Sequence, residues 1–427
     1  MKLTSYWLDT STPAGDFRST PVPERVDVAI VGAGFTGLAA ALEIAAAGGS
    51  VAVFDTHTVG WGASGRNGGM ATTGLAIGLG SAIKRYGLDT ALSMFTEYNH
   101  AIDSIEDLVR AHSIDCDFER TGKMTLAMND KQYQGMVQTR DLLAKHLDHH
   151  VDVVPRSQIR DEIGSDFYAG AMVDPAGAGV HVGWFVHGLA AAAVRAGATI
   201  CEDSEVVTMD RLPDGRHRLA TVRGVVEADD VLVATSGYTG ALTPWLQRRT
   251  VPVGSFIVVT EPLGDEAARL ALPHRRQAAD NKMLTYYFRL IGDRMLFGGR
   301  ARFSLSSPNS DLKSAEILKD ALAQVFPHLA GSRIDYTWGG LVDISMDRMV
   351  HAGVRDGVHY SLGYSGHGVQ MATYMGRQLG LKLAGKDYRN VWAGLSYPAV
   401  PGHFGPPWFL PFVGAGAKVL DRLGVVV

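Results

Sequence analysis

The sequence of residues 26–55 is VDVAIVGAGFTGLAAALEIAAAGGSVAVFD, and it decides the fold. Residues 26–31 are apolar and mostly β-branched except for Asp27, as a buried parallel strand requires. A helix is predicted over 36–47, where two glycines end it, and a second strand is predicted over 51–54. This order of strand, glycine-rich turn, helix and strand predicts a βαβ unit in an α/β fold.

Each glycine of the turn has a separate physical role. Gly32 allows a tight turn out of the strand, Gly34 lets backbone approach a pyrophosphate, and Gly37 lets the helix lie close to the sheet. The start of the helix, with Phe35 and Thr36, presents unpaired N–H groups and a partial positive charge to phosphates. The motif therefore predicts a dinucleotide-binding site.

The second strand ends on an acidic residue, Asp55. Its carboxylate can accept hydrogen bonds from both ribose hydroxyls of an adenosine, and it would repel a 2′-phosphate. Glycine-rich turns are common, so an empty structural turn is the alternative. Because the strand, the helix and the terminal acid all accompany the glycines here, we favour the dinucleotide.

A second glycine-rich segment, TVGWGASGRNGGM at 58–70, distinguishes between cofactors. NAD needs no such loop after the ribose-binding strand, whereas the longer FAD needs more backbone close to its diphosphate, ribityl chain and ring. A flexible surface loop is the alternative, but Trp61 and Met70 bracket the glycines and favour burial. We therefore predict FAD. The residues predicted to contact it here are Gly62, Ala63, Ser64, Arg66, Asn67, Gly68, Gly69 and Met70.

Composition excludes several classes of partner. The chain of 427 residues has a formal net charge of −4 and no basic stripe, which argues against nucleic acid. No stretch reaches the roughly 18 apolar residues of a membrane span. Cys116 and Cys201 form no CxxC or His/Cys cluster, so we expect no metal site and a cytoplasmic location. The apolar end, 396–427, is predicted to be a packing tail, with a membrane-surface helix as the alternative.

These motifs resemble the D-amino-acid-oxidase-like FAD-dependent oxidoreductases, and the resemblance is closest to the γ-glutamylputrescine oxidoreductase branch. Further similar segments extend it over most of residues 5–400. They are Ser5-Tyr6, RAGATICEDSEVV at 195–207, DDVLVATSGYTGAL at 229–242 and SLGYSGHGVQMATYMGRQLG at 361–380. The resemblance implies that backbone near Val206 contacts adenine, and that Ala234, Thr235 and Gly237 pass near the cofactor.

The segment near the C-terminus is similar to the flavin loop of that family. It supplies Gly363, Gly366, His367, Gly368 and Val369, after which a helix is predicted. Backbone N–H groups at a helix N-terminus would stabilise the negative charge that the flavin N1–C2=O region gains on reduction. An ordinary glycine-rich entry to a helix is the alternative.

The expected architecture is a discontinuous Rossmann-like FAD domain with an inserted α+β substrate domain built on a mixed sheet. The FAD domain is predicted to comprise 24–80, 150–240 and 335–395. The substrate domain is predicted to comprise 85–145 and 245–330.

The resemblance implies oxidation of a small amine or an N-substituted amino compound. A hydride leaves the carbon next to nitrogen for flavin N5, the imine hydrolyses, and oxygen or another acceptor takes the electrons. Some relatives attach the flavin through a C-terminal cysteine or through a histidine in the first glycine-rich loop. Here no cysteine follows Cys201 and Ser64 to Arg66 occupy that loop, so we predict noncovalent FAD.

Five side chains are candidates for chemistry or substrate binding. His367 could balance charge at the ring edge, with a structural role equally favoured, and Lys282 could assist oxygen reduction. Tyr287 and Arg289 share one face of a predicted strand, where Arg289 could hold a carboxylate, although an ordinary ion pair is favoured. Trp338 could form a wall of the pocket, with core packing as the equal alternative.

Two other functions remain open from the sequence. A flavin dehydrogenase would pass electrons to a quinone or a partner protein and react poorly with oxygen. A flavoprotein subunit without turnover would bind FAD but would not be reduced by amines.

Overall fold

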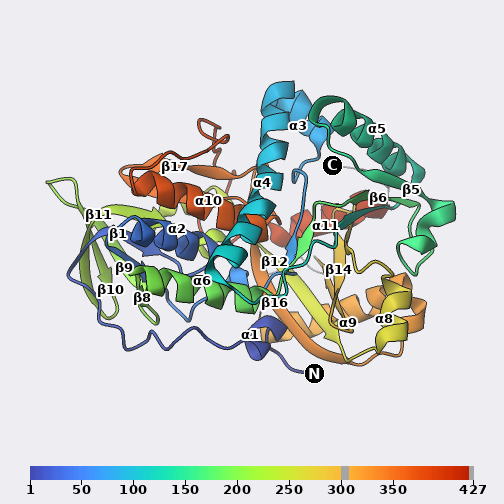
Figure 1. Cartoon of the computed structure of the whole chain (residues 1–427), viewed down its shortest axis with the longest axis horizontal. Coiled ribbons are helices and arrows are strands. Elements are labelled where there is room, and N and C mark those ends of the chain that lie inside the picture. Colours follow the sequence, from blue (N-terminus) through green and yellow to red (C-terminus); the bar gives the residue numbers. More distant parts are fainter. Residues whose placement is uncertain (300–306, 423–427) are drawn as a thin grey trace.

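A computed structural model describes residues 1–299 and 307–422, and two eight-stranded sheets organise them (Figure 1). In the first sheet, β1 pairs in parallel with β2 and β11, β2 with β8, and β11 with β18. Its path is β17 (His351–Arg355), β18 (Val358–Leu362), β11 (Gly224–Val233), β1 (Arg25–Val31), β2 (Val51–Phe54) and β8 (Thr199–Cys201). The antiparallel strands β10 (His217–Thr221) and β9 (Val206–Arg211) extend it beside β11. The predicted βαβ unit and α/β class are confirmed.

Helices cover one face of this sheet, and two of them approach each other closely at glycines. The helix α2 (Phe35–Ala46) lies against both α10 (Gly368–Leu383) and α6 (Val182–Ala196), as Figure 1 shows. A Cβ added at Gly376 of α10 would lie 2.4 Å from the carbonyl oxygen of Thr36. A Cβ at Gly380 would lie 2.7 Å from that of Ala40. Only glycine at these two positions lets the two helices approach this closely. The long helix α4 (Leu88–His112) packs on α10.

The second sheet is mostly antiparallel. Its order is β16 (Ile334–Ser345), β12 (Thr250–Thr260), β15 (Arg294–Gly299), β14 (Tyr286–Ile291), β13 (Gln277–Asp280), β4 (Lys123–Ala127), β6 (Gly170–Asp174) and β5 (Asp152–Pro155). Only β13 and β4 pair in parallel among the described strands of this sheet. One face packs on α8 (Asp265–Ala271) and α9 (Pro308–Val325) through a core that includes Phe256, Phe288 and Phe297. The helix α5 (Asp130–Leu147) packs on β4, β5 and β6.

Two segments of the predicted FAD domain belong partly to the second sheet. Within 150–240, β5 and β6 pair with each other and with β4. Within 335–395, β16 pairs with β12 from Thr250 to Thr260. An apolar strand pattern does not reveal which distant strand it pairs with, and the domain boundaries stay a prediction.

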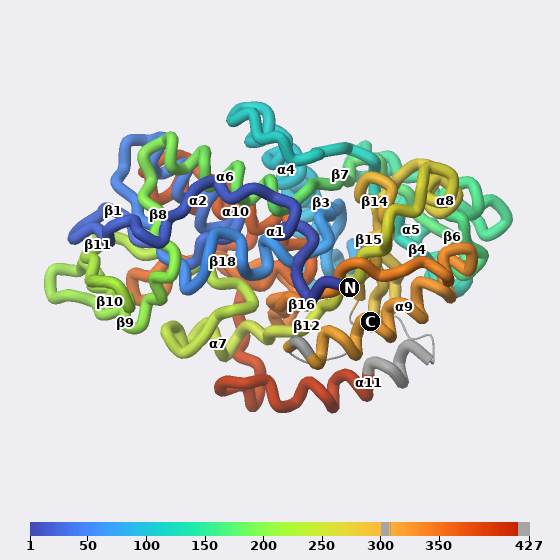
Figure 2. The backbone as a smooth tube through the Cα atoms, turned by 90° about the horizontal axis from the view of Figure 1, so that it is seen from below, coloured from blue at the N-terminus to red at the C-terminus, as the bar shows by residue number. Residues whose placement is uncertain are grey.

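The C-terminal tail is only partly packed. Phe409 and Leu410 contact Val251 and Val253 of β12, at the start of α11 (Leu410–Arg422). Beyond those contacts α11 runs along the outside of the molecule, as Figure 2 shows. Phe404, Trp408 and Phe412 are 66–72% exposed, and residues 423–427 of the predicted tail lie outside the described part of the chain. No helix in the described ranges is long and apolar enough to span a membrane.

Short elements complete the structure. They are α1 (Tyr6–Thr10), β3 (Met70–Ala71), α3 (Leu79–Tyr86), β7 (Ala178–Gly179), α7 (Pro244–Gln247) and four 3-10 turns at Ala63–Gly65, Arg156–Asp161, Ser236–Tyr238 and Pro327–Leu329. The segment that precedes α1 reaches the second sheet, where Lys2 forms a β-bridge with Tyr336 of β16.

His181 fixes the start of α6 and the position of α1. Its Nδ1 accepts the N–H of Trp184 at 3.2 Å, which defines His181 as the N-cap, and its Nε2 lies 3.0 Å from Thr10 Oγ1. An Nδ1 that accepts a hydrogen bond carries no proton, so Nε2–H donates to the threonine. Burial lowers the pKa of His181 to about 4 from its ordinary 6.5.

We predict that this cap weakens in acid. Between pH 6.5 and 4 the unfolded chain binds a proton at His181 that the folded chain does not. The stability contributed by neutral His181 is present above pH 6.5 and decreases as pH falls through this window, by up to about 3 kcal/mol. His181→Asn keeps a capping acceptor that does not titrate. Urea unfolding of both proteins at several pH values should show a shallower acid decline for the variant, and identical slopes would contradict the assignment.

Candidate functional site

The first glycine-rich turn leaves backbone donors without protein partners. Gly32 has φ +113°, and a Cβ at Gly37 would lie 2.0 Å from the Gly32 carbonyl oxygen, so both positions require glycine. The Ser64 hydroxyl accepts the N–H of Phe35 at 2.9 Å. Within residues 1–299 and 307–422, the N–H groups of Gly34 and Thr36 have no acceptor. An anion placed at the start of α2 would satisfy them.

Asp55 lies behind this turn. Its Oδ2 accepts the N–H of Ala33 at 2.7 Å and its Oδ1 accepts the N–H of His57 at 2.9 Å. Burial raises the pKa of Asp55 above its ordinary value, and the two N–H donors oppose that rise. The carboxylate therefore braces the turn, and its remaining lone pairs are the ones available to a ribose.

The segment predicted to contact adenine lies beside Asp55 at the end of β2, and the segment after β11 lies beside Gly32 at the end of β1. Val206 begins β9 and is buried, and Ser204 donates its N–H to the carbonyl oxygen of Asp55 at 2.7 Å. Ala234 follows β11, and its carbonyl oxygen lies 2.7 Å from where a Cβ of Gly32 would be. Thr235 and Gly237 continue into a 3-10 turn beside Leu341.

The second glycine-rich loop is held from behind by side chains of three distant segments. Ser5 Oγ donates to the Gly65 carbonyl at 2.5 Å, and Trp7 Nε1 donates to the Asn67 carbonyl at 2.7 Å. Trp338 Nε1 donates to the Arg66 carbonyl at 3.0 Å. Arg289 donates to the carbonyls of Gly69 and, at 3.2 Å, Val180. Arg289 and Trp338, predicted to contact substrate, are thus placed against the back of this loop and are not among the described cavity-lining residues.

Asn67 organises the same loop from within. Its Nδ2 donates to the carbonyls of Ala63 and Ser64 at 2.9 and 3.0 Å, and its Oδ1 accepts the N–H of Gly69 at 2.8 Å. Gly69 itself has φ +67°, a left-handed conformation that glycine adopts without strain. The loop is therefore a defined structure without reference to any ligand.

The C-terminal loop is connected to the first turn. Asp343 Oδ2 accepts the N–H of Gly363 at 2.8 Å, and the Asp343 carbonyl accepts the N–H of Ser365 at 3.0 Å. The hydroxyls of Tyr364 and Thr36 lie 2.8 Å apart. Burial raises the pKa of Asp343 to about 6. His367 is the N-cap of α10, and its ring contacts the edge of Tyr98.

All three turns open into one cavity of about 1200 Å³. This exceeds the roughly 300–1,000 Å³ of a single small-ligand site and leaves room for a substrate beside part of a long cofactor. The predicted residues that line it are Gly34, Phe35, Thr36, Ala63, Ser64, Arg66, Asn67, Gly68, Met70, Ala234, Gly366, His367, Gly368, Val369, Lys282 and Tyr287. The predicted residues placed outside this lining are Gly32, Gly37, Asp55, Gly62, Gly69, Val206, Thr235, Gly237, Gly363, Arg289 and Trp338.

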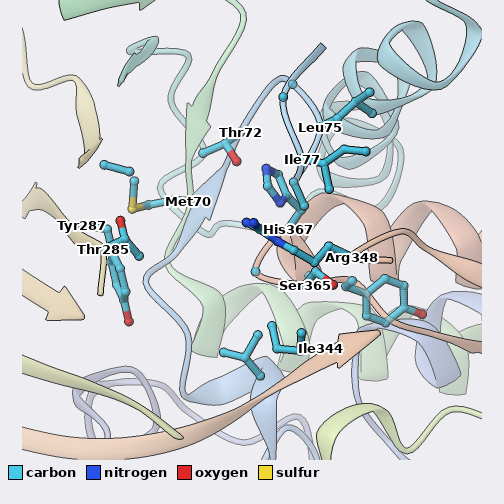
Figure 3. A pocket seen from close by; sticks show the side chains of 18 of the residues that line it. Met70, Thr72, Leu75, Ile77, Thr285, Tyr287, Ile344, Arg348, Ser365 and His367 are labelled. Carbon is cyan, nitrogen blue, oxygen red and sulfur yellow. The ribbon is translucent and has the colours of Figure 1, made fainter. Parts of the chain in front are cut away.

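The cavity walls are mostly apolar, with a few polar groups on opposite sides. Figure 3 shows His367, Ser365 and Arg348 on one side and Met70 and Tyr287 on the other. Tyr287 faces the cavity, whereas Tyr286 packs in the core of the second sheet, as strand alternation predicts. The hydroxyl of Tyr287 lies 2.9 Å from that of Ser255.

Besides the exposed Lys131, two cations that line the cavity were not found from the sequence. Arg348 projects its guanidinium into the cavity beside His367 (Figure 3), and the described residues offer it no carboxylate. Burial lowers its pKa, and its backbone is left-handed, with φ +61°. Lys123 donates to the carbonyl of Thr73 at 2.9 Å, and burial lowers its pKa. No local motif marks either residue, because only the pairing of β4 and the turn after β16 bring them to the cavity.

The acids that line the cavity are already engaged. Asp174 accepts hydrogen bonds from Thr73 at 2.6 Å and His149 at 2.9 Å. Burial raises the pKa of Asp174, but these bonds outweigh it, so the net pKa is lowered. Asp280 forms a 3.0 Å ion pair with Lys282, although burial still raises its pKa to about 6. Lys282 also lies 3.4 Å from the ring centre of Tyr286.

Comparison with known proteins gives a consistent result. A family model described as FAD dependent oxidoreductase matches residues 27–380. The chain is 33% identical over 408 residues to a probable oxidoreductase OrdL of Haemophilus influenzae, covering 93% of this chain and 92% of that protein. It is 32% identical over 428 residues to the gamma-glutamylputrescine oxidoreductase of Escherichia coli, covering 99% of each.

Solved structures share the fold. The crystal structure of glycine oxidase from Geobacillus kaustophilus superposes with a TM-score of 0.73 at 21% identity, covering 89% of this chain and all of that one. L-proline dehydrogenase from P. horikoshii superposes with a TM-score of 0.71 at 17% identity, covering 87% and 96%. The matched family model spans most of the chain and includes all three turns around the cavity. The chain therefore belongs to the FAD-dependent oxidoreductase family that the sequence motifs resemble.

Proposed function

We propose that this protein oxidises a C–N bond of a small amine or N-substituted amino compound, with bound FAD as the first electron acceptor and oxygen as the second. The observation that carries the proposal is the single cavity, in which three sets of backbone donors meet an apolar space lined by Tyr287 and Met70. The 32% identity to gamma-glutamylputrescine oxidoreductase over 99% of the chain supports an amine as the substrate.

We also propose that FAD is held without a covalent bond. The N–H groups of Gly34 and Thr36 would bind the diphosphate, and Asp55 the ribose. Asn67, Gly68 and the start of α10 would contact the ring. Both cysteines are buried and unpaired, and neither is among the described residues that line the cavity. The cytoplasmic location expected from these cysteines stays a prediction.

Bound FAD would supply the hydride acceptor, and the chain supplies the position and the charge. Met70, Ile344 and Tyr287 would exclude water from the reacting carbon. Because Asp174, Asp280 and Asp343 are already hydrogen-bonded or ion-paired, they would have fewer lone pairs to offer a substrate ammonium group. Arg348 and Lys123 further disfavour a protonated amine and favour a substrate that carries an anionic group elsewhere.

The two residues predicted to be catalytic keep proposed roles. His367, at the start of α10, would add to the positive end of that helix near the reduced ring. Lys282 would assist oxygen reduction, and its ion pair with Asp280 holds its ammonium at the cavity wall. Both assignments rest on the position of the side chain in the cavity.

We predict that Gly34→Val abolishes retention of FAD without unfolding the protein. The new Cβ would lie 2.8 Å from Ser64 Oγ, which can rotate, so the fold tolerates it. Losing two or more N–H contacts to phosphate should weaken FAD binding by about a hundredfold or more. Absorbance of the purified protein and titration of the apoprotein with FAD measure this, with circular dichroism for the fold.

Gly331→Val is the matched control, because Gly331 is exposed and has nothing within 4 Å of an added Cβ. It should keep wild-type flavin content. Full flavin content in Gly34→Val would refute the placement of the diphosphate. Flavin that stays with the wild-type protein after acid denaturation would refute noncovalent binding.

We predict that amines bleach the bound flavin under anaerobic conditions, and that oxygen restores it with formation of peroxide. The panel should pair amines that carry a carboxylate, γ-glutamylputrescine among them, with uncharged amines of similar length. Absence of bleaching by every amine would contradict the proposed reaction. Bleaching followed by slow reoxidation in oxygen, but fast reoxidation by a quinone, would instead establish a dehydrogenase.

Arg348 should determine which of these amines bind best. We predict that Arg348→Met raises KM for carboxylate-bearing amines by about ten- to a hundredfold, since hydrogen bonds to charged groups contribute roughly 1.5–3 kcal/mol. Values of kcat, and of KM for uncharged amines, should change little. Arg355→Met, which removes an exposed arginine paired with Asp356, is the control. An equal effect on both amine classes would contradict an anion-binding role.

A further inference from the structure

We propose that Trp7 and Trp338 are positioning residues for the flavin, because they set the direction of two peptide groups in the second glycine-rich loop. Their indole N–H groups donate to the carbonyls of Asn67 and Arg66 at 2.7 and 3.0 Å. Both indoles are buried, at 0% and 1% exposure, so neither bond competes with water. The inference rests on FAD occupying the cavity and not on the identity of the amine.

The geometry of the peptide bond carries the argument. In a trans peptide the C=O of one residue and the N–H of the next point in opposite directions. A donor that fixes the Arg66 carbonyl on the back of the loop therefore turns the Asn67 N–H to the front. In the same way, the bond from Trp7 to the Asn67 carbonyl turns the Gly68 N–H to the front.

These two N–H groups are among those of the loop that have no acceptor in the described residues. Within the described ranges of the chain, neither the N–H of Asn67 nor that of Gly68 has an acceptor, and both residues line the cavity. Both residues are half-buried, so two adjacent unpaired donors that face the cavity are available to a ligand acceptor at this place. The polar edge of the flavin ring, which carries carbonyl oxygens and ring nitrogens, has that chemistry.

A third donor behind the loop provides an internal contrast. Ser5 Oγ donates to the Gly65 carbonyl at 2.5 Å, in the peptide group whose N–H belongs to Arg66. That N–H already donates to the Ala63 carbonyl at 3.3 Å, inside the loop. Ser5 therefore stabilises the loop without directing a free N–H into the cavity, and its loss should affect stability more than flavin binding.

Phenylalanine substitutions test the proposal, since they remove the indole N–H and keep an aromatic ring. Without its donor, the Arg66 or Asn67 carbonyl would turn toward other partners in the apoprotein, and FAD would have to reverse that turn. Trp7→Phe and Trp338→Phe should each weaken FAD binding by about three- to tenfold. Each should also shift the visible spectrum and the midpoint potential of the bound flavin. Ser5→Ala should change FAD affinity by no more than about twofold.

Trp392→Phe is the matched control. Trp392 is 1% exposed, and its Nε1 has no acceptor in the part of the chain that the structure describes. It should lower the melting temperature without changing the flavin spectrum, the potential or FAD affinity. Trp7→Phe and Trp338→Phe proteins with wild-type affinity, spectrum and potential would overturn the proposal, as would equal shifts in Trp392→Phe.

Hydrogen exchange of the apoprotein gives a readout that needs neither flavin nor substrate. The Arg66 and Gly69 amides are hydrogen-bonded within the loop, and they should exchange faster in Trp338→Phe and Trp7→Phe than in the wild type, and as in the wild type in Trp392→Phe. If Trp7→Phe fails to fold, Trp338→Phe tests the proposal by itself, because the Trp338 indole holds the neighbouring peptide group. Unchanged exchange would reject the proposal. None of these outcomes depends on amine turnover, so they are separate from a failure of the proposed reaction.

Discussion

The close approach of α2 and α10 is the constraint on which the site depends. Backbone carbonyls of α2 face Gly376 and Gly380 of α10, with no Cβ between the two helices. This contact brings the N-termini of both helices to the same cavity, where the hydroxyls of Thr36 and Tyr364 meet. Two helix N-termini then present partial positive charge to one ligand from segments more than 300 residues apart. A larger side chain at either glycine would separate the diphosphate turn from the C-terminal loop.

Local patterns in the sequence predicted the elements of this arrangement. The strand, turn and helix of residues 25–46 and the helix after His367 depend on nearby residues, and both are present. The pairing of β5, β6 and β16 in the second sheet was not predicted, since strand pairing depends on distant partners that apolar patterns do not specify.

Side chains that act across the fold could not be found in the same way. Trp338 was predicted to form a pocket wall or to pack in the core, and Arg289 to hold a carboxylate or, by preference, to form an ion pair. In the structure they donate to the carbonyls of Arg66 and Gly69. Only the tertiary structure shows this, because β14 and β16 reach the loop from the second sheet. Arg348 does line the cavity, but it was not predicted from the sequence. It follows a strand in a sequence without any motif, and a left-handed turn directs it into the cavity.

The first seven residues have a consequence for the order in which the protein matures. Trp7 leaves the ribosome long before Trp338, and the carbonyls of Asn67 and Arg66 each accept a hydrogen bond from one of these indoles. A nascent chain that ends before β16 contains the diphosphate turn but lacks the donor to the Arg66 carbonyl. From the proposed role of the two indoles, we expect FAD to bind tightly only after β16 has joined the second sheet.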